Sequence, residues 1–213
     1  MSKRGDFQRK IGDLLFDELK KSGWEKDLGN PEIYGLRKKN GANTWGVSFN
    51  LSGREEYSIY SSQDVSYNEY SSILKTKLDS IFTQDNPLII GVVSRNIDFS
   101  SFKLTTESDV KLLVDFFRDK IKEAESTFYE PYSDESNVVK KNMSSFHWKW
   151  PSQPYMQFVL FMIGYAIKNN DLSKINFAYE KVKLLKDKFQ PRPGEMDKVN
   201  SIFNELVKLG LMK

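Results

Sequence analysis

The chain has 213 residues, of which 39% are hydrophobic and 29% are charged, and its net charge is +3 at pH 7. This length suits one large domain or two small ones, and the composition is that of a folded chain. Cysteine is absent, which excludes disulfides, thiolate nucleophiles and cysteine-ligated metal centres.

The longest apolar run covers residues 155–167. It is shorter than the roughly 20 residues that a membrane-spanning helix needs, so it predicts a buried helix. The charged amino terminus shows no apolar segment of the kind that signal peptides carry. We therefore expect a soluble, cytoplasmic protein without a membrane partner.

Basic side chains concentrate toward the carboxyl terminus. Residues 1–130 carry 19 basic and 21 acidic side chains, whereas residues 131–213 carry 13 and 8. An excess of positive charge suits an acidic partner or nucleic acid, but scattered lysines are also typical of a solvated helical surface. Both interpretations stay open at this point.

The amino-terminal part predicts a helix followed by three strands. Apolar residues at helical spacing indicate a helix over 6–22, namely Phe7, Ile11, Leu14, Leu15 and Leu19. The expected strands are 32–39, 44–52 and 55–61. The second strand is the clearest, because its apolar side chains alternate with small or polar ones, at Trp45, Val47, Phe49 and Leu51.

Two further helices and a buried strand are expected next. Ser66 and Glu69 have the spacing of a capping box, which predicts that a helix begins there. Residues 88–93 form a continuous apolar run, which favours a central strand covered on both faces. Thr106 and Asp109 repeat the capping-box spacing in front of a regular apolar stripe.

The last third of the chain is expected to be a long connection followed by helices. Residues 126–153 lack a helical stripe and are rich in serine, proline and asparagine. Three helices are expected after them, at 153–168, 172–189 and 194–209. The fold class is therefore α+β, with an α+β domain over 1–125, a connection over 126–153 and a helical region over 154–213.

The connection contains an unusual aromatic stretch, SFHWKWP, with the one histidine of the chain. In an extended chain Phe146, Trp148 and Trp150 share one face, and His147 lies on the other. One interpretation is structural, since buried rings would fasten the connection to the rest of the molecule. The other is a binding pocket, in which His147, Trp148 and Trp150 contact a partner.

A second candidate surface lies at residues 57–72, where sixteen residues include four tyrosines and six serines. Tyrosine and serine together are the composition of adaptable recognition surfaces. The candidate partner-binding residues are Tyr57, Tyr60, Tyr67 and Tyr70. The structural alternative is that these rings are half-buried parts of the core.

The sequence lacks the motifs of several common chemistries. Neither a glycine-rich phosphate loop nor a GxSxG nucleophile motif occurs, and no acidic cluster has the spacing of a calcium loop. We therefore assign no catalytic residue, no metal site and no cofactor, and we lean against an enzyme. An enzyme that works through carboxylates remains a third possibility.

The order helix, three strands, helix, strand over residues 6–93 resembles the core of the PD-(D/E)xK nuclease superfamily. Members hold Mg²⁺ with an acid on the second core strand and an acidic-x-Lys motif on the third. Here 44–52 contains no acid and 55–61 contains no acidic-x-Lys. The resemblance implies a non-catalytic relative that binds nucleic acid through basic residues, with candidates Arg37, Lys38, Lys39, Lys140 and Lys141.

The succession of a helix, a strand meander and helical hairpins is also similar to small bacterial immunity or accessory proteins, which bind a toxin or an enzyme. Our first hypothesis is therefore a non-enzymatic protein-binding module of this immunity or defence type, with a protein partner. Our second hypothesis is the nucleic-acid-binding nuclease relative, which predicts binding that weakens steeply with salt.

Overall fold

The chain folds as an α+β protein. The computed structural model describes residues 3–27, 33–53, 56–78, 92–99, 104, 106–144, 154–186, 191 and 193–212. They group into two compact units, each built from two separate stretches of sequence. The first unit comprises residues 1–65 and 94–134, and the second comprises 66–93 and 135–213. This division differs from the expected one, because residues 66–93 belong with the carboxyl-terminal helices.

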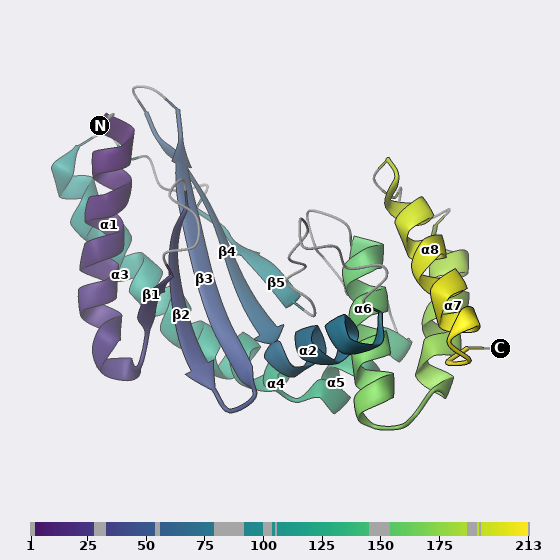
Figure 1. The fold of residues 1–213 in the computed structure, drawn as a ribbon. Helices are drawn as coiled ribbons and strands as arrows, with labels where there is room; N and C mark the ends of the chain where they lie inside the picture. Colours follow the sequence, from purple (N-terminus) through teal and green to yellow (C-terminus); the bar gives the residue numbers. More distant parts are fainter. Residues whose placement is uncertain are drawn as a thin grey trace. The chain divides into compact units, whose positions relative to one another are not determined.

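The first unit combines most of a sheet with three helices and two short turns (Figure 1). Its helical elements are α1 (Lys3–Leu19), a 3₁₀ turn (Lys20–Ser22), α3 (Glu107–Ala124), a π-helical turn (Glu125–Tyr129) and α4 (Glu130–Ser133). The strands are β1 (Glu25–Asp27), β2 (Tyr34–Asn40), β3 (Asn43–Ser52), β4 (Ser58–Tyr67) and β5 (Val92–Ile97). The described residues form one five-stranded sheet in the order β1-β2-β3-β4-β5.

The sheet register separates an apolar face from a polar one. Strand β2 pairs antiparallel with both β1 and β3, and Leu36 lies opposite Val47 while Arg37 lies opposite Gly46. Because side chains alternate along a strand, Leu36 and Val47 point to one face and Arg37 points to the other. The alternation predicted for 44–52 is confirmed, because Trp45, Val47, Phe49 and Leu51 are all buried.

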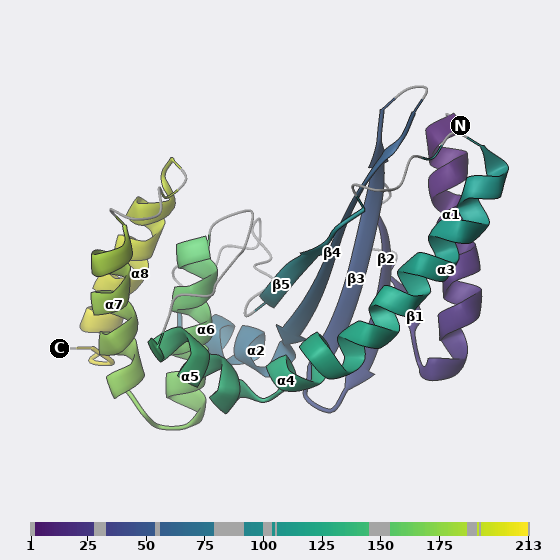
Figure 2. The ribbon, with the colours of Figure 1, turned by 180° about the vertical axis from the view of Figure 1, so that it is seen from behind.

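Aromatic rings fill the space between the apolar face and the helices. Phe49 of β3 meets Phe117 of α3 edge to face at 5.3 Å between ring centroids. Trp45 stacks on Tyr129 of the π-helical turn at 5.0 Å. Figure 2 shows α3 running across the sheet, and rings at these positions account for the contact. Each such ring removes roughly 150–250 Å² from water, so this layer is the main stabilising core of the unit.

Helix boundaries in the first unit follow local sequence signals. Gly23 ends the 3₁₀ turn with φ of 85°, and its N–H donates to the Lys20 carbonyl at 3.1 Å. The capping box of Thr106 and Asp109 is confirmed at the start of α3. The expected capping box at Ser66 is wrong, because β4 continues through Ser66 and the helix begins only at Asn68.

Two other expectations are corrected. Residues 126–133 and 135–144, taken from the sequence as part of a connection, are helical. Their apolar residues do not follow a regular helical spacing, because the π-helical turn inserts an extra residue and shifts the phase of the apolar pattern. The strand expected at 88–93 begins at Val92 and lies at one end of the sheet order, not at its centre. Residues 88–91 lie outside the described residues.

The second unit is a bundle of helices. Its helices are α2 (Asn68–Lys77), α5 (Glu135–Ser144), α6 (Pro154–Lys168), α7 (Ser173–Leu185) and α8 (Glu195–Lys208). The three expected carboxyl-terminal helices are thus confirmed within a few residues. Helix α6 is the central one, since every side chain from Tyr155 to Ile163 is buried, and it packs against α2, α7 and α8. Among the described residues, no helix is long and apolar enough to cross a membrane.

A buried carboxylate joins two of these helices. Glu195, at the start of α8, is only 1% exposed. Its Oε1 accepts hydrogen bonds from the backbone N–H groups of Tyr155 at 2.9 Å and Met156 at 3.2 Å. These N–H groups belong to the first turn of α6, which has no intrahelical acceptor for them. Glu195 therefore caps α6 from a distant position in the sequence.

Candidate functional site

Only one of the four candidate tyrosines is exposed. Tyr60 has 61% of its surface accessible, whereas Tyr57, Tyr67 and Tyr70 are each 3% exposed or less. Tyr57 lies in the core of the first unit, where its ring meets Phe7 at 5.7 Å. Burial removes these three tyrosines from any contact surface, so Tyr60 alone is retained as a candidate partner-binding tyrosine.

Tyr67 and Tyr70 belong to the core of the second unit. Their rings stack on each other at 5.5 Å, and both contact Phe161 of α6. The Tyr70 hydroxyl donates to Glu135, which also accepts from Lys168. Burial and the hydrogen bond to the Glu135 carboxylate raise the pKa of Tyr70 well above its ordinary value. This arrangement ties α2, α5 and α6 together.

The exposed Tyr60 stands on the polar face of the sheet. It alternates along β4 with the buried Ile59 and Ser61. Two positions further, the Ser62 hydroxyl is 3.0 Å from the Ser48 hydroxyl of β3. We define the polar face by the residues of β1 to β4 on this side: Asp27, Gly35, Arg37, Thr44, Gly46, Ser48, Asn50, Tyr60, Ser62 and Asp64.

An ion-pair network lies at the centre of the polar face. The Arg37 Nε donates to Asp27 Oδ2 at 2.8 Å, and its Nη1 donates to Asp64 Oδ1 at 2.6 Å. These contacts join β1, β2 and β4 across the sheet. Burial disfavours the charge on Arg37, but the two carboxylates outweigh that effect and raise the pKa of its guanidinium. Arg37 therefore keeps its charge and a fixed orientation.

Two glycines keep this network close to the sheet. A Cβ at Gly46 would overlap Arg37 Nη1 and both carboxylate oxygens of Asp64. A Cβ at Gly35 would lie 3.0 Å from the Asp27 Cβ. The absence of side chains at these positions lets the guanidinium and the carboxylates lie flat on the strands. Around Arg37 the polar face therefore has no side chains at positions 35 and 46.

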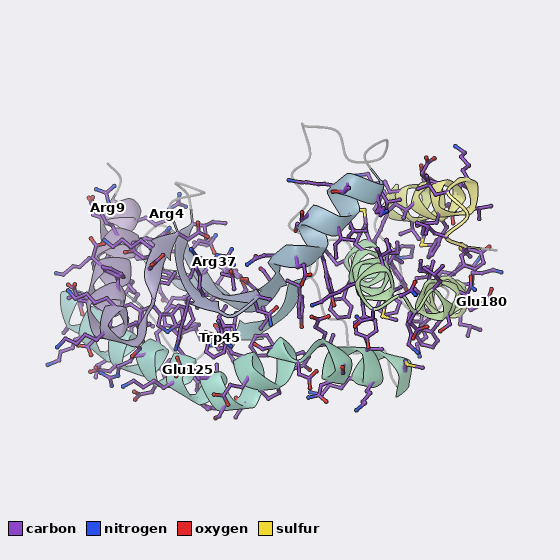
Figure 3. All side chains as sticks on the ribbon, turned by 60° about the horizontal axis from the view of Figure 1, so that its bottom comes forward. Arg4, Arg9, Arg37, Trp45, Glu125 and Glu180 are labelled. Atoms are coloured by element: carbon purple, nitrogen blue, oxygen red, sulfur yellow. The ribbon has the colours of Figure 1, made fainter. Side chains whose placement is uncertain are left out.

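The neighbouring candidates Arg37 and Lys38 lie on opposite faces of the sheet. Arg37 is paired as described, and Lys38 points to the opposite face of β2. There its Nζ is 2.8 Å from Glu125 and 5.0 Å from the centre of the Trp45 ring. Figure 3 shows Glu125 and Trp45 toward α3, and Arg37 on the other side of the sheet.

The remaining candidate cations lie on two units. Lys39 is exposed near the end of β2 in the first unit, and Lys140 and Lys141 are exposed on α5 in the second. Arg37 and Lys38 are the candidates that carboxylates already hold at short range. Of the three candidate cations in the first unit, Arg37 and Lys38 are therefore paired with carboxylates, which weakens their attraction for a phosphate backbone, and Lys39 is exposed.

Several predictions about the site lie beyond the described residues. His147, Trp148 and Trp150 lie outside the described residues, so both interpretations of the aromatic stretch stay predictions. Within the described ranges, no group of three or more histidine, aspartate or glutamate side chains is arranged to hold a metal ion.

Asp27 and Asp64 were not predicted from the sequence as site residues. Asp64 has a local signal, because it continues the alternation of β4 beyond residue 61, where the expected strand stopped. Its pairing with Arg37, 27 positions away, depends on the order of the strands and has no local signal. Asp27 belongs to a three-residue strand without an apolar pattern.

Comparisons of the chain with protein-family models, curated proteins and solved structures find no match.

Proposed function

We propose that this protein is a non-enzymatic protein-binding module, and that the polar face around Tyr60 is its binding surface. The single observation that carries the proposal is a tyrosine with 61% of its surface exposed, on the same sheet face as the Ser48 and Ser62 hydroxyl groups. Tyrosine offers a large amphipathic contact area at low conformational cost, and serine and asparagine supply adaptable hydrogen bonds.

The kind of partner follows from the pattern of the whole chain. Its similarity in style to bacterial immunity and accessory proteins makes a toxin or an enzyme the first class of partner to test. A cytoplasmic location belongs to this proposal. The nucleic-acid alternative is weaker, because Arg37 and Lys38 are each bound to carboxylates.

The test compares two variants in affinity capture. Tagged protein is incubated with native lysate, one half is treated with nuclease, and the bound proteins are identified by mass spectrometry. We expect one stoichiometric protein that survives nuclease treatment. Its affinity for purified Tyr60→Ala should fall at least about 10-fold, because exposed tyrosines at interface centres often contribute that much.

Leu112→Ala is the matched control. Leu112 lies on α3 of the same unit and has 66% of its surface exposed. The Leu112→Ala variant therefore loses an exposed side chain of comparable accessibility away from the polar face. This variant should bind the partner as the unmodified chain does. Equal loss in both variants, or no loss in either, would contradict the polar face as the binding surface. Capture that disappears with nuclease treatment would favour the nucleic-acid hypothesis.

A further inference from the structure

The hairpin between β2 and β3 has a two-residue turn. The strand register pairs Asn40 with Asn43, so Gly41 and Ala42 make the turn between them. Gly41 has a φ of 59°, whereas the φ of Ala42 is not positive. Glycine with a positive φ at the first central position is typical of a type II′ turn. An asparagine therefore stands directly before a glycine at the tip of a hairpin.

Asn40 and Gly41 are both open to solvent. A Cβ at Gly41 would meet nothing within 4 Å apart from its own neighbours in the chain. Within the described part of the chain, no hydrogen bond holds the side-chain amide of Asn40 or the N–H of Gly41. Neither group is therefore restrained by a partner among the residues that the structure describes.

An asparagine followed by glycine can react with its own backbone to form a cyclic imide. The Gly41 main-chain nitrogen loses its proton to solvent and attacks Cγ of Asn40. A bond between that nitrogen and Cγ forms, the bond between Cγ and Nδ2 breaks, and ammonia leaves. The reaction is intramolecular and glycine has no Cβ to hinder the nitrogen, so no enzyme is required. Water then opens the imide at the side-chain carbonyl to give aspartate, or at the main-chain carbonyl to give isoaspartate.

We infer that Asn40 is a site of spontaneous deamidation in the folded protein. The attack requires the Asn40 backbone to turn out of its strand conformation. The tip of the hairpin allows this rotation, because exposed turns open locally at a small cost in free energy. The inference is independent of the proposed binding function, and its test needs no partner.

Asn43 is the internal comparison. It is 8% exposed, and its Nδ2 donates to the Ser133 carbonyl at 2.8 Å. The nitrogen that would attack it belongs to Thr44, which is paired with β2 in the sheet and is β-branched. Asn43 is therefore protected by burial, by a hydrogen bond and by the pairing of the attacking residue, and the exposed Asn40–Gly41 pair lacks these three protections in the described structure.

The isoaspartate product lengthens the backbone of the hairpin. Its main chain runs through Cβ and Cγ of residue 40, which adds an extra carbon atom before Gly41. The pairing of residue 40 with Asn43 is then disturbed, and Asn43 carries the contact with Ser133. The isoaspartate form should therefore unfold at a lower urea concentration than freshly prepared Asn40→Asp, which gains the same charge without the extra carbon. Equal unfolding midpoints would overturn this effect on the fold.

The main experiment incubates the folded protein in mildly alkaline buffer, digests it with an acid protease and locates each converted asparagine by tandem mass spectrometry. We expect the converted fraction at Asn40 to be at least about 10-fold greater than at Asn43, because small misplacements of reacting groups slow intramolecular reactions by such factors. Electron-transfer fragmentation should show isoaspartate among the products. Asn40→Gln should abolish conversion at this position, since glutamine would have to close a larger ring.

A urea-unfolded sample is the reference for the effect of the fold. In that sample the conversion of Asn40 reports the intrinsic reactivity of the Asn40–Gly41 pair, and Asn43 has lost its protection. Comparable conversion of Asn40 and Asn43 in the folded protein would overturn the inference. An intact Asn40 in the folded protein would also overturn it, and conversion in urea alone would show that the hairpin protects this residue.

Discussion

Gly46 has close neighbours on both faces of the sheet. On the core side its carbonyl accepts a hydrogen bond from the Tyr129 hydroxyl at 2.8 Å. On the polar face the Arg37–Asp64 pair occupies the space that a side chain would need. A single methyl group at this position therefore competes with a partly buried ion pair.

We expect Gly46→Ala to lower the free energy of unfolding by about 1–3 kcal/mol, because the added methyl group displaces Arg37 from Asp64. Urea unfolding followed by tryptophan fluorescence measures the change. In a background that already carries Arg37→Ala and Asp64→Ala, the same substitution should cost less than about 0.5 kcal/mol. An equal cost in both backgrounds would mean that the strain arises elsewhere.

Glu195 gives a second prediction at the scale of a residue. Its carboxylate caps α6, so Glu195→Ala leaves two buried N–H groups without that acceptor and should cost about 1–3 kcal/mol. Glu195→Gln keeps an acceptor oxygen and should cost less. Asp197→Ala removes an exposed acid from the same first turn of α8 and serves as the control. A cost for Asp197→Ala as large as that for Glu195→Ala would contradict the cap.

Elements of the first unit are joined by a cluster that responds to pH. The Tyr34 hydroxyl of β2 donates to Asp13 of α1 at 2.9 Å, and Lys26 of β1 donates to the same oxygen at 2.6 Å. Burial and the hydrogen bond to Asp13 raise the pKa of Tyr34 to about 12. Burial opposes ionisation of Asp13, but its hydrogen bonds from Lys26 and Tyr34 prevail and lower its pKa.

The sign of the pH effect follows from the Tyr34 pKa, which is 10.0 in an ordinary environment and about 12 in the fold. Between these values the unfolded chain loses the Tyr34 proton first, so the contribution of Tyr34 to stability is complete below pH 10 and is lost by about pH 12. We expect Tyr34→Phe to reduce the fall in unfolding free energy over this range, measured by urea unfolding at several pH values. An identical fall in Tyr34→Phe and the unmodified chain would contradict this assignment.

Asp13→Asn tests the cause of the raised Tyr34 pKa. Removal of the carboxylate removes the negative charge that opposes phenolate formation, so the phenolate absorbance of Tyr34 should appear at lower pH.

Asp13 makes stability depend on pH in the opposite direction, at acid pH. The depressed pKa of Asp13 stabilises the fold above its ordinary value of 3.8, and that contribution is lost as the pH falls through the lower folded value.

Elements with a complete local pattern were predictable from the sequence. Strand β3 is an example, because Trp45, Val47 and the two apolar residues that follow in alternation all reach the core. Strand β1 was missed, since Glu25–Asp27 has no apolar residue and is defined by its pairing with β2. The helical path of 126–133 and 135–144 was missed because the π-helical turn interrupts the spacing on which a prediction depends.

The candidate site was predictable in part. The Tyr/Ser composition of 57–72 pointed to Tyr60, but composition does not separate an exposed ring from a buried one. Tyr67 and Tyr70 have the same flanking chemistry and lie in the core of the other unit. The Arg37 network required the register of β2 on β3 and the neighbouring position of β4, which are long-range properties.

At the scale of the whole molecule, each unit depends on residues that are distant in sequence. The second unit needs α2, whose Tyr70 and Leu74 are 1% and 0% exposed. We therefore expect a fragment of residues 135–213 to show reduced helicity and no cooperative unfolding in circular dichroism. A peptide of residues 66–78 added to it should restore both, whereas the same peptide with Leu74→Asp should not. Cooperative unfolding of the fragment alone would contradict the composition of the unit.

The position of α2 in the second unit also sets an order of events during synthesis on the ribosome. Tyr70 and its ring partner Phe161 are 91 positions apart, and translation proceeds at roughly 5–20 residues per second. Helix α2 therefore waits roughly 5–18 s, at those rates, before the α6 segment that covers its apolar face is made. During that interval Tyr70 and Leu74 lack their final neighbours, so the nascent chain carries a temporary site for chaperones. The speed of translation across residues 80–160 is thus a variable that acts on the yield of folded protein without changing any amino acid.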